Sequence, residues 1–255
     1  MRRLLAISVI ATLVGGCTGD DAGCEFEPTL TVLAAASLTE AFGRIGERFE
    51  VAGPCVHVRF SFGPSDGLAT QILEGSPADV FASASPTWMD VVVEDGPGIQ
   101  DRVDFARNSL VVITPADDTT TVRSLDDLAN VGAKLVLAAE GVPAGDYARE
   151  ILANAGITDG ALANVVSNEE DVKGVVQKIL LGEADAGIVY RTDVTEGVRS
   201  QVRTVEIPED VNVIATYPIA VIASTENLDQ AGAFVDFVLG DGQEILRSFG
   251  FLPAS

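Results

Sequence analysis

Strand-like and helix-like segments alternate along most of this chain. Residues 29–36 (TLTVLAAA) are apolar and β-prone, and in 38–50 the residues Leu38, Phe42, Ile45 and Phe49 recur every three or four positions, as in an amphipathic helix. The same order returns in 56–62 with 68–75, 78–84 with 86–96, 109–115 with 124–130, and 134–140 with 144–156, and a helix at 171–183 precedes a strand at 186–190. This alternation is typical of a mostly parallel sheet covered by helices.

The last third of the chain departs from this order. A strand-like segment at 216–224 is followed by two helix-like segments at 228–240 and 241–250, and there is neither an internal repeat nor a low-complexity linker. We expect two lobes joined by short crossings, with the chain returning late to the first lobe.

The N-terminus predicts export. Arg2 and Arg3 precede an apolar run at 4–14, which is too short to span a membrane but is typical of a cleaved signal peptide. Residues 14–17 (VGGC) also resemble a bacterial lipobox, so we expect a signal peptide at 1–16, a lipid on Cys17 and an acidic tether at 17–27. The alternative is an ordinary secretory signal with a free cysteine nearby.

Cys24 and Cys55 remain as one pair in an oxidising compartment. Each lies just ahead of a predicted strand, so the two would meet at one edge of a parallel sheet if those strands are neighbours. A disulfide there would stabilise the fold by about 3 to 4 kcal/mol in the chain-entropy model. Two unpaired thiols are the alternative.

Charge excludes some partners. Without Arg2 and Arg3 the chain has 14 basic and 38 acidic residues, a net charge of −24. A field of this sign repels phosphates, so nucleic acid and anionic membrane surfaces are poor partners. The only expected membrane attachment is the lipid.

Residues 63–67 (GPSDG) match the G-x-S-x-G pattern of a hydrolase nucleophile elbow, with a predicted strand before and a helix after. The chain's single histidine, His57, lies upstream in that strand, about 25 Å from Ser65 along the chain. Lys134, Lys173 and Lys178 lie in no motif that would make one of them a base for this serine. Ser65 is therefore a poor nucleophile.

An anion site is the other use of such a turn, because backbone N–H groups in the first turn of a helix lack partners. Small or apolar turns without Lys or Arg also open helices near Ser37, Ala144 and Val172. Ser37 taken alone is more often only an N-cap. The recurrence of such turns indicates more than capping.

These segments carry a family resemblance. The sequences at 34–42 (AAASLTEAF), 62–72 (FGPSDGLATQI), 142–149 (VPAGDYAR) and 186–193 (AGIVYRTD), among others between 31 and 251, resemble the molybdate-binding proteins of bacterial ABC importers. The resemblance implies a two-lobe periplasmic-binding-protein clamshell (type II). Each lobe would be an α/β unit with a mostly parallel sheet flanked by helices, and two hinge crossings would join the lobes. We expect lobe 1 at 28–107 and 217–255, and lobe 2 at 108–216.

The resemblance also implies a ligand set. Ser37 and Ser65 would offer hydroxyl and N–H groups, Ala144 and Val172 N–H groups only, and Tyr190 its phenol hydroxyl. Without the resemblance, Tyr190 would be read as an aromatic side chain packing at a strand end.

The sequence departs from the family at Pro64 and Asp66, where small residues or serine are commoner. Proline removes one possible N–H donor, and aspartate places a carboxylate beside the site. Trp88 is expected in the core.

The expected function is an extracytoplasmic receptor that captures molybdate or tungstate and delivers it to a membrane permease with a cytoplasmic ATPase. We expect a monomer with no catalytic activity, no cofactor and no metal other than that of the oxyanion. The alternatives are a receptor of the same fold for sulfate or another tetrahedral oxyanion and, from another class, a secreted serine hydrolase with Ser65 as nucleophile.

One helix start decides the role of Val172. A capping box at 167–170 (SNEE) would start the helix at Asn168 and bond the amide of Val172 within it. The ligand role needs that amide to be free. We therefore expect a loop or separate turn at 167–170, Asp171 as N-cap and Val172 as the first helical residue.

Overall fold

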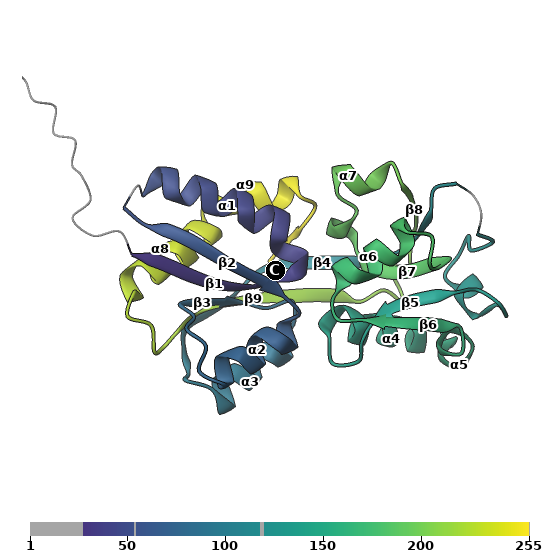
Figure 1. Cartoon of the computed structure of the whole chain (residues 1–255), viewed down its shortest axis with the longest axis horizontal. Coiled ribbons are helices and arrows are strands. Elements are labelled where there is room, and N and C mark those ends of the chain that lie inside the picture. Colours follow the sequence, from purple (N-terminus) through teal and green to yellow (C-terminus); the bar gives the residue numbers. More distant parts are fainter. Residues whose placement is uncertain (1–27, 54, 118–119, 255) are drawn as a thin grey trace, which may run out of the picture.

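The computed structural model describes residues 28–53, 55–117 and 120–254, which form two α/β lobes side by side (Figure 1). The first lobe contains β1 (Thr29–Ala35), η1 (Ala36–Leu38), α1 (Thr39–Ala52), β2 (His57–Gly63), α2 (Ser65–Leu73), β3 (Val80–Ala82), α3 (Pro86–Asp95), α8 (Leu228–Leu239), α9 (Gly242–Ser248) and β10 (Leu252–Pro253). The second contains η2 (Asp126–Ala129), β5 (Leu135–Ala138), α4 (Pro143–Asn154), α5 (Thr158–Leu162), β6 (Val165–Glu169), α6 (Val172–Leu180), β7 (Ala186–Tyr190), η3 (Arg191–Asp193), α7 (Glu196–Arg199) and β8 (Val202–Val205).

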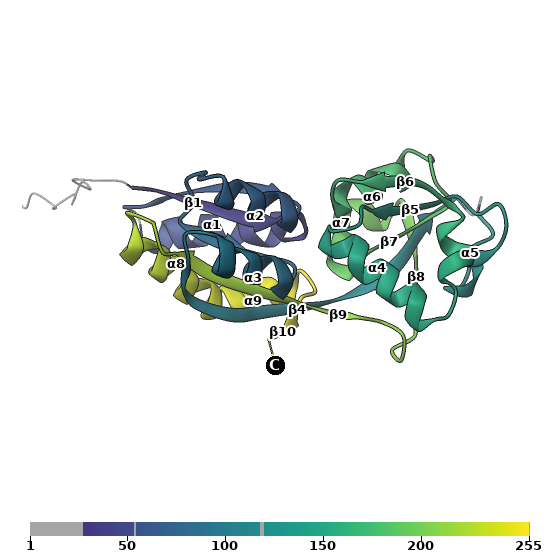
Figure 2. The same ribbon diagram turned by 90° about the horizontal axis from the view of Figure 1, so that it is seen from below.

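Two long strands run from one lobe into the other, β4 (Ile99–Pro115) and β9 (Ile214–Ile222) (Figure 2). They pair antiparallel with each other as far as Ser109 and Ile214. From Leu110 onward β4 pairs instead with β7 and, from Val112, with β8. β4 therefore changes its pairing partner after Ser109, and the lobe bounds at 107/108 and 216/217 stay a prediction.

The sheet of each lobe is mostly parallel. In the first lobe β2, β1 and β3 are parallel, and β9 joins β3 antiparallel. In the second lobe β6, β5 and β7 are parallel, and β4 joins β7 antiparallel. The sheet order is β2-β1-β3-β9-β4-β7-β5-β6, so the two-lobe α/β fold is confirmed.

Helices cover both faces of the first sheet because its inner strands β1 and β3 are apolar on both sides. Val32 and Ala34 of β1 face the core that contains the side chains of α1, α8 and α9. Leu33, between them, belongs to a separate core with α2 and α3. The predicted apolar stripe of α1 is confirmed, since Leu38, Phe42, Ile45 and Phe49 are all buried.

Two sequence expectations are wrong. Residues 167–169 are not a loop or turn, because 165–169 form strand β6, which pairs in parallel with β5, and only Glu170 lies in the turn before α6. β4 begins at Ile99 rather than near residue 109, because the polar residues at its start pair with β9. In both segments partner strands overrode a weak local preference.

The N-terminal predictions fall largely outside the described residues, which begin at 28 and so exclude Cys17 and Cys24. β1 and β2 are parallel neighbours, with Thr29 opposite His57. Cys55, just ahead of β2, is disulfide-bonded. Its pairing with Cys24 stays a prediction. Within the described ranges, no helix is both long enough and apolar enough to cross a membrane.

Candidate functional site

The residues that sequence analysis singled out as ligands come together at one place between the lobes. Ser37 and Ser65 from the first lobe and Ala144, Val172 and Tyr190 from the second line a small cavity of about 20 Å³. The remaining lining residues are Ala35, Ala36, Gly63, Pro64, Ala84, Val142, Pro143 and Asp171. The size and position of the cavity suit one small ligand that contacts both lobes.

Helix starts supply backbone donors to this cavity. Ser65 is the first residue of α2 and Val172 the first of α6, while Ala144 is the second residue of α4, after Pro143. Amides at these positions have no carbonyl within their own helix to bond. The positive ends of the three helix dipoles therefore lie at the cavity wall, which favours an anion.

The start of α6 is as predicted. Asp171 is the N-cap, and its Oδ1 accepts a hydrogen bond of 2.9 Å from the amide of Gly174. The helix begins at Val172, so the capping box at 167–170 is not used. Glu169 belongs to β6, and the chain turns at Glu170, which leaves Asp171 free to adopt the extended backbone of a cap.

The two serine hydroxyls each have one protein partner. Ser65 Oγ accepts a 3.0 Å hydrogen bond from the amide of Ala84. Ser37 Oγ lies 3.0 Å from the hydroxyl of Tyr217 on β9. Both serines are buried, at 1% and 4% exposure. Their side chains are therefore held in place at the cavity wall.

Tyr190 ends β7 with its hydroxyl buried and without a hydrogen-bond partner among the described residues. Burial raises the pKa of this phenol well above its ordinary value, so the group keeps its proton. Its ring packs edge-on against Tyr217, with centroids 5.8 Å apart. A buried, unpaired donor at the wall of a cavity indicates a place for a ligand acceptor.

No Lys or Arg is among the residues that line the cavity. Asp66, the second residue of α2, adds a carboxylate nearby, and its Oδ1 is buried without a partner in the described chain. Burial, with a smaller contribution from Asp146, raises the pKa of Asp66, although its neighbouring backbone amides lower it. An anion here would be held by dipoles and hydroxyls rather than by salt bridges.

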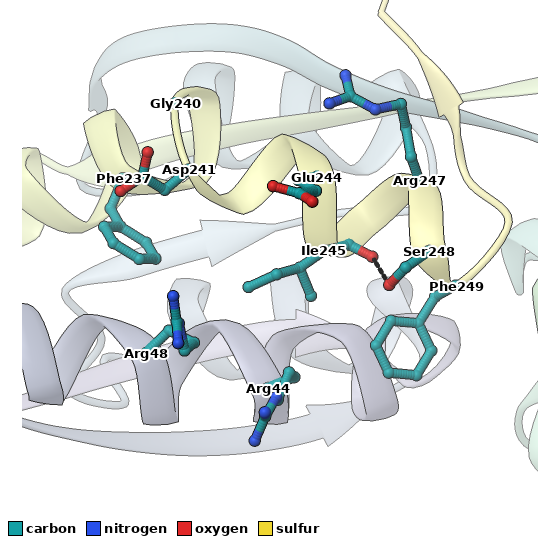
Figure 3. A pocket seen from close by; sticks show the side chains of 10 residues that line it. All are labelled: Arg44, Arg48, Phe237, Gly240, Asp241, Glu244, Ile245, Arg247, Ser248 and Phe249. Atoms are coloured by element: carbon teal, nitrogen blue, oxygen red, sulfur yellow. Dashed lines mark hydrogen bonds between the residues drawn. The ribbon is translucent and has the colours of Figure 1, made fainter.

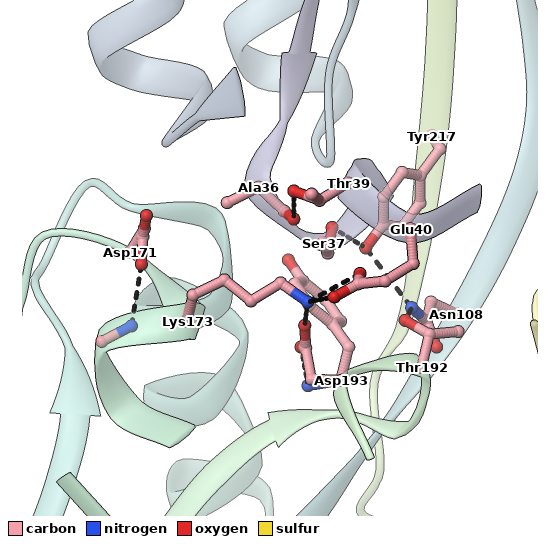
Figure 4. Close-up of polar contacts among 12 residues, drawn as sticks. Ala36, Ser37, Thr39, Glu40, Asn108, Asp171, Lys173, Thr192, Asp193 and Tyr217 are labelled. Carbon is pink, nitrogen blue, oxygen red and sulfur yellow. Dashed lines mark hydrogen bonds and ion pairs between the residues drawn. The ribbon is translucent and has the colours of Figure 1, made fainter. Parts of the chain in front are cut away.

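An ion-pair cluster that sequence analysis missed connects the lobes beside the site (Figure 4). Lys173 of α6 bonds both carboxylate oxygens of Glu40 on α1, at 3.0 and 2.9 Å, and lies 3.2 Å from Asp193 Oδ1. Asp193 Oδ2 accepts from the amide of Tyr190. Lys173, next to Val172 on α6, is thus tied to α1 and η3, which directly follow the segments that carry Ser37 and Tyr190. Only its position directly after Val172 could have drawn attention to it.

The pKa values reflect this burial. Burial raises the pKa of Asp193 to about 6, even though Lys173 lowers it. Burial also lowers the pKa of Lys173, but Asp193 and Glu40 raise it by more, so the net shift is upward.

The lobes also touch through aromatic side chains. Trp88 Nε1 of α3 donates a 2.8 Å bond to the carbonyl of Gly141, and the hydroxyl of Tyr147 on α4 lies 3.4 Å from the carbonyl of Ala84. Trp88 is partly buried and makes an inter-lobe contact, so its assignment to the core alone was too simple. These bonds hold the two lobes together around the cavity.

A larger hollow of about 770 Å³ lies between α1 and α9. Its arginines do not converge, since Arg44 and Arg247 point away from each other (Figure 3). Arg44 is paired with Glu47 at 2.7 Å. This surface lacks the convergent donors of the inter-lobe cavity.

The strand, turn and helix around Ser65 match the context of a nucleophile elbow, but a base is missing from it. His57 begins β2, whereas Ser65 follows the other end of that strand, and His57 Nδ1 is 3.8 Å from Glu50. Nothing in the described structure activates Ser65 as a nucleophile would need.

Comparison with known proteins agrees with this geometry. Residues 30–252 match the family described as bacterial extracellular solute-binding protein. The chain belongs to this family. It is 37% identical over 254 residues to the molybdate-binding protein ModA of Mycobacterium tuberculosis, covering 97% of this chain and 95% of the relative.

Solved structures of the same fold extend the comparison. The substrate-binding domain of a putative molybdenum ABC transporter from Clostridium difficile has a TM-score of 0.68 and 33% identity, covering 89% of this chain and 100% of that one. The periplasmic molybdate-binding protein of Azotobacter vinelandii has a TM-score of 0.78 at 20% identity, again over 89% and 100%, and supports the fold alone. As a member of this family, the chain is an extracellular solute-binding protein.

Proposed function

We propose that this protein captures molybdate or tungstate between its lobes and delivers it to an ABC importer. The observation that carries the proposal is the cavity lined by Ser37, Ser65, Ala144, Val172 and Tyr190, in which hydroxyl and amide donors from both lobes meet. Because both lobes contribute donors, the anion favours the closed arrangement of the lobes. The proposed partner is a membrane permease with a cytoplasmic ATPase, and the receptor itself needs no catalysis or cofactor.

A tetrahedral dianion matches a wall made of donors. Its four oxygens accept hydrogen bonds. The residues that line the cavity include no Lys or Arg, so the wall does not favour an anion that needs a salt bridge. The net charge of the exported chain opposes approach only weakly at close range, because salt screens charge beyond about 8 Å. Contact dipoles therefore decide binding.

A sulfate receptor of the same fold is the alternative within this class. Sulfate offers the same acceptor oxygens, but its S–O bonds are shorter. Selectivity between sulfate and the larger anions therefore depends on how closely the donors of the cavity approach one another. The identity to molybdate-binding relatives over nearly the full chain favours the larger anions.

Replacing Ser65 with alanine should weaken oxyanion binding by about 1 to 3 kcal/mol, the range for a hydrogen bond to a charged group. The measurement is calorimetric titration with molybdate. Ser248→Ala is the matched control, because Ser248 is an exposed serine of the same lobe that bonds only the carbonyl of Ile245. Unchanged affinity of Ser65→Ala would remove this residue from the site. A fluorophosphonate probe should not label Ser65, and labelling would support the hydrolase instead.

The lipid anchor rests on residues 14–17 of the sequence and is a separate proposal. Cys17→Ser should release the protein from the membrane fraction into the soluble extracytoplasmic fraction. Cys24→Ser is the control, because it changes a neighbouring cysteine and leaves Cys17 in place. An unaltered membrane fraction for Cys17→Ser would refute the anchor.

A further inference from the structure

Behind the cavity, a buried chain of polar groups links the two crossing strands to Ser37 (Figure 4). Tyr217 of β9 lies 3.0 Å from Ser37 Oγ, and Asn108 Nδ2 of β4 lies 3.4 Å from the Tyr217 hydroxyl. The same Nδ2 donates a 2.8 Å bond to Thr192 Oγ1. Tyr217 and Asn108 are fully buried. Neither residue lines the cavity, so each acts on a ligand indirectly, and their hydrogen bonds reach the cavity wall at Ser37.

The chemistry of these groups determines which of them donates and which accepts in each hydrogen bond. An amide nitrogen only donates, so Asn108 donates a hydrogen bond to the hydroxyl oxygen of Tyr217. Burial raises the pKa of Tyr217, so this phenol keeps its single hydrogen, and the acceptor within reach of that hydrogen is Ser37 Oγ. Ser37 then accepts from Tyr217 and has its own hydrogen left to point into the cavity.

The hydroxyl of Ser65 also accepts a hydrogen bond from the protein, but from a different donor. The amide of Ala84 can only donate, and it donates to Ser65 Oγ. Both serine hydroxyls therefore receive a bond from the protein and offer their hydrogen to the ligand. Two separate contacts within the first lobe therefore fix the same direction.

We propose that Tyr217, oriented by Asn108, is a specificity-determining positioning residue that holds the Ser37 hydroxyl as a donor and so disfavours oxyanions that carry a proton. This inference rests on the proposed oxyanion function. A fully deprotonated anion presents only acceptors and satisfies the site. A hydrogen phosphate ion needs an acceptor for its own O–H. Ser37 already accepts from Tyr217, so it could accept from the ligand only through its second lone pair, with its own hydrogen turned away from the ligand.

The test is Tyr217→Phe, which keeps the ring that packs edge-on against Phe105, Tyr190 and Phe251 and removes only the hydroxyl. Molybdate affinity is measured by calorimetry at pH 8, where phosphate is mostly hydrogen phosphate, and phosphate is then added as a competitor. We expect molybdate affinity to fall about tenfold, the equivalent of one modest hydrogen bond. We expect phosphate to compete more strongly relative to molybdate than it does in the wild type.

Tyr147→Phe is the matched control. The Tyr147 hydroxyl bonds across the lobes to the carbonyl of Ala84 and does not touch either serine hydroxyl, so its loss should weaken all oxyanions by a similar factor. The melting temperature without ligand checks that each variant folds. Unchanged molybdate affinity in Tyr217→Phe, or a loss with no relative gain for phosphate, would overturn the inference. Failure of the wild type to bind any oxyanion would instead refute the proposed function.

Discussion

Lys173→Met should destabilise the protein by about 3 to 5 kcal/mol at pH 7.5, the cost of leaving a buried charge without its partner. The buried charge is Asp193, whose side chain has 0% exposure and lies 3.2 Å from the lysine Nζ. The partly exposed bond from Lys173 to Glu40 contributes little to this, because such pairs are worth about 0 to 1 kcal/mol. The measurement is urea unfolding without ligand.

The effect should shrink at low pH. The folded-state pKa of Asp193 is about 6, above its ordinary 3.8, so the stability that this group confers is present below about 3.8 and is lost as pH rises through 6. Lys173 lowers the pKa of Asp193, so its removal raises that pKa further. The variant therefore loses additional stability above pH 6, where Asp193 is ionised in the wild type. Glu40, Tyr217 and the amide of Tyr190 act on the same carboxyl in both proteins. The variant should therefore approach the wild type near pH 5.

Lys178→Met is the control for a lysine on the same helix. Lys178 pairs with an exposed Glu183 within the second lobe, so its loss should leave the free energy of unfolding nearly unchanged. An equal effect of the two variants, or a Lys173→Met effect that does not vary with pH, would contradict the role given to Asp193.

Gly145→Ala should abolish high-affinity binding and cost about 1 to 3 kcal/mol of stability, as overpacking does. A Cβ at this position would lie 2.1 Å from the carbonyl oxygen of Ala139 and 2.4 Å from that of Ala138. These are backbone atoms at the end of β5, so the start of α4 must move away and take the amide of Ala144 with it. The measurements are molybdate titration and thermal unfolding.

Gly43→Ala provides the comparison within a helix. Nothing lies within 4 Å of a Cβ at Gly43, so alanine there should raise stability by up to about 1 kcal/mol through helix propensity and leave binding unchanged. Wild-type affinity in Gly145→Ala would show that the start of α4 is not a fixed part of the site.

Local patterns predicted the elements whose signals lie within one segment. The apolar stripe of α1 and the cap at Asp171 depend on neighbouring residues, and both are as expected. Strand β6 was missed because VVSNE has two apolar residues followed by three polar ones and so lacks an alternating pattern, and its pairing with β5 makes it a strand.

The candidate site was also only partly predictable from the sequence. Turns at helix starts are visible in the sequence, and the resemblance to a family placed Tyr190 beside them. The residues behind the site were not predictable, because Tyr217 is 180 positions from Ser37 and Glu40 is 133 from Lys173. Contacts across such separations arise only when distant segments fold together, within the first lobe for Ser37 and between the lobes for Lys173, and no local spacing encodes them.

Calorimetric titration of the wild-type protein with molybdate, tungstate, sulfate and phosphate tests the proposed function most directly. We predict one site per chain, with molybdate and tungstate binding tightly, sulfate more weakly and phosphate weakest of all. Tighter binding of sulfate than of molybdate would make this a sulfate receptor of the same fold. An absence of binding to all four anions would contradict the oxyanion site itself.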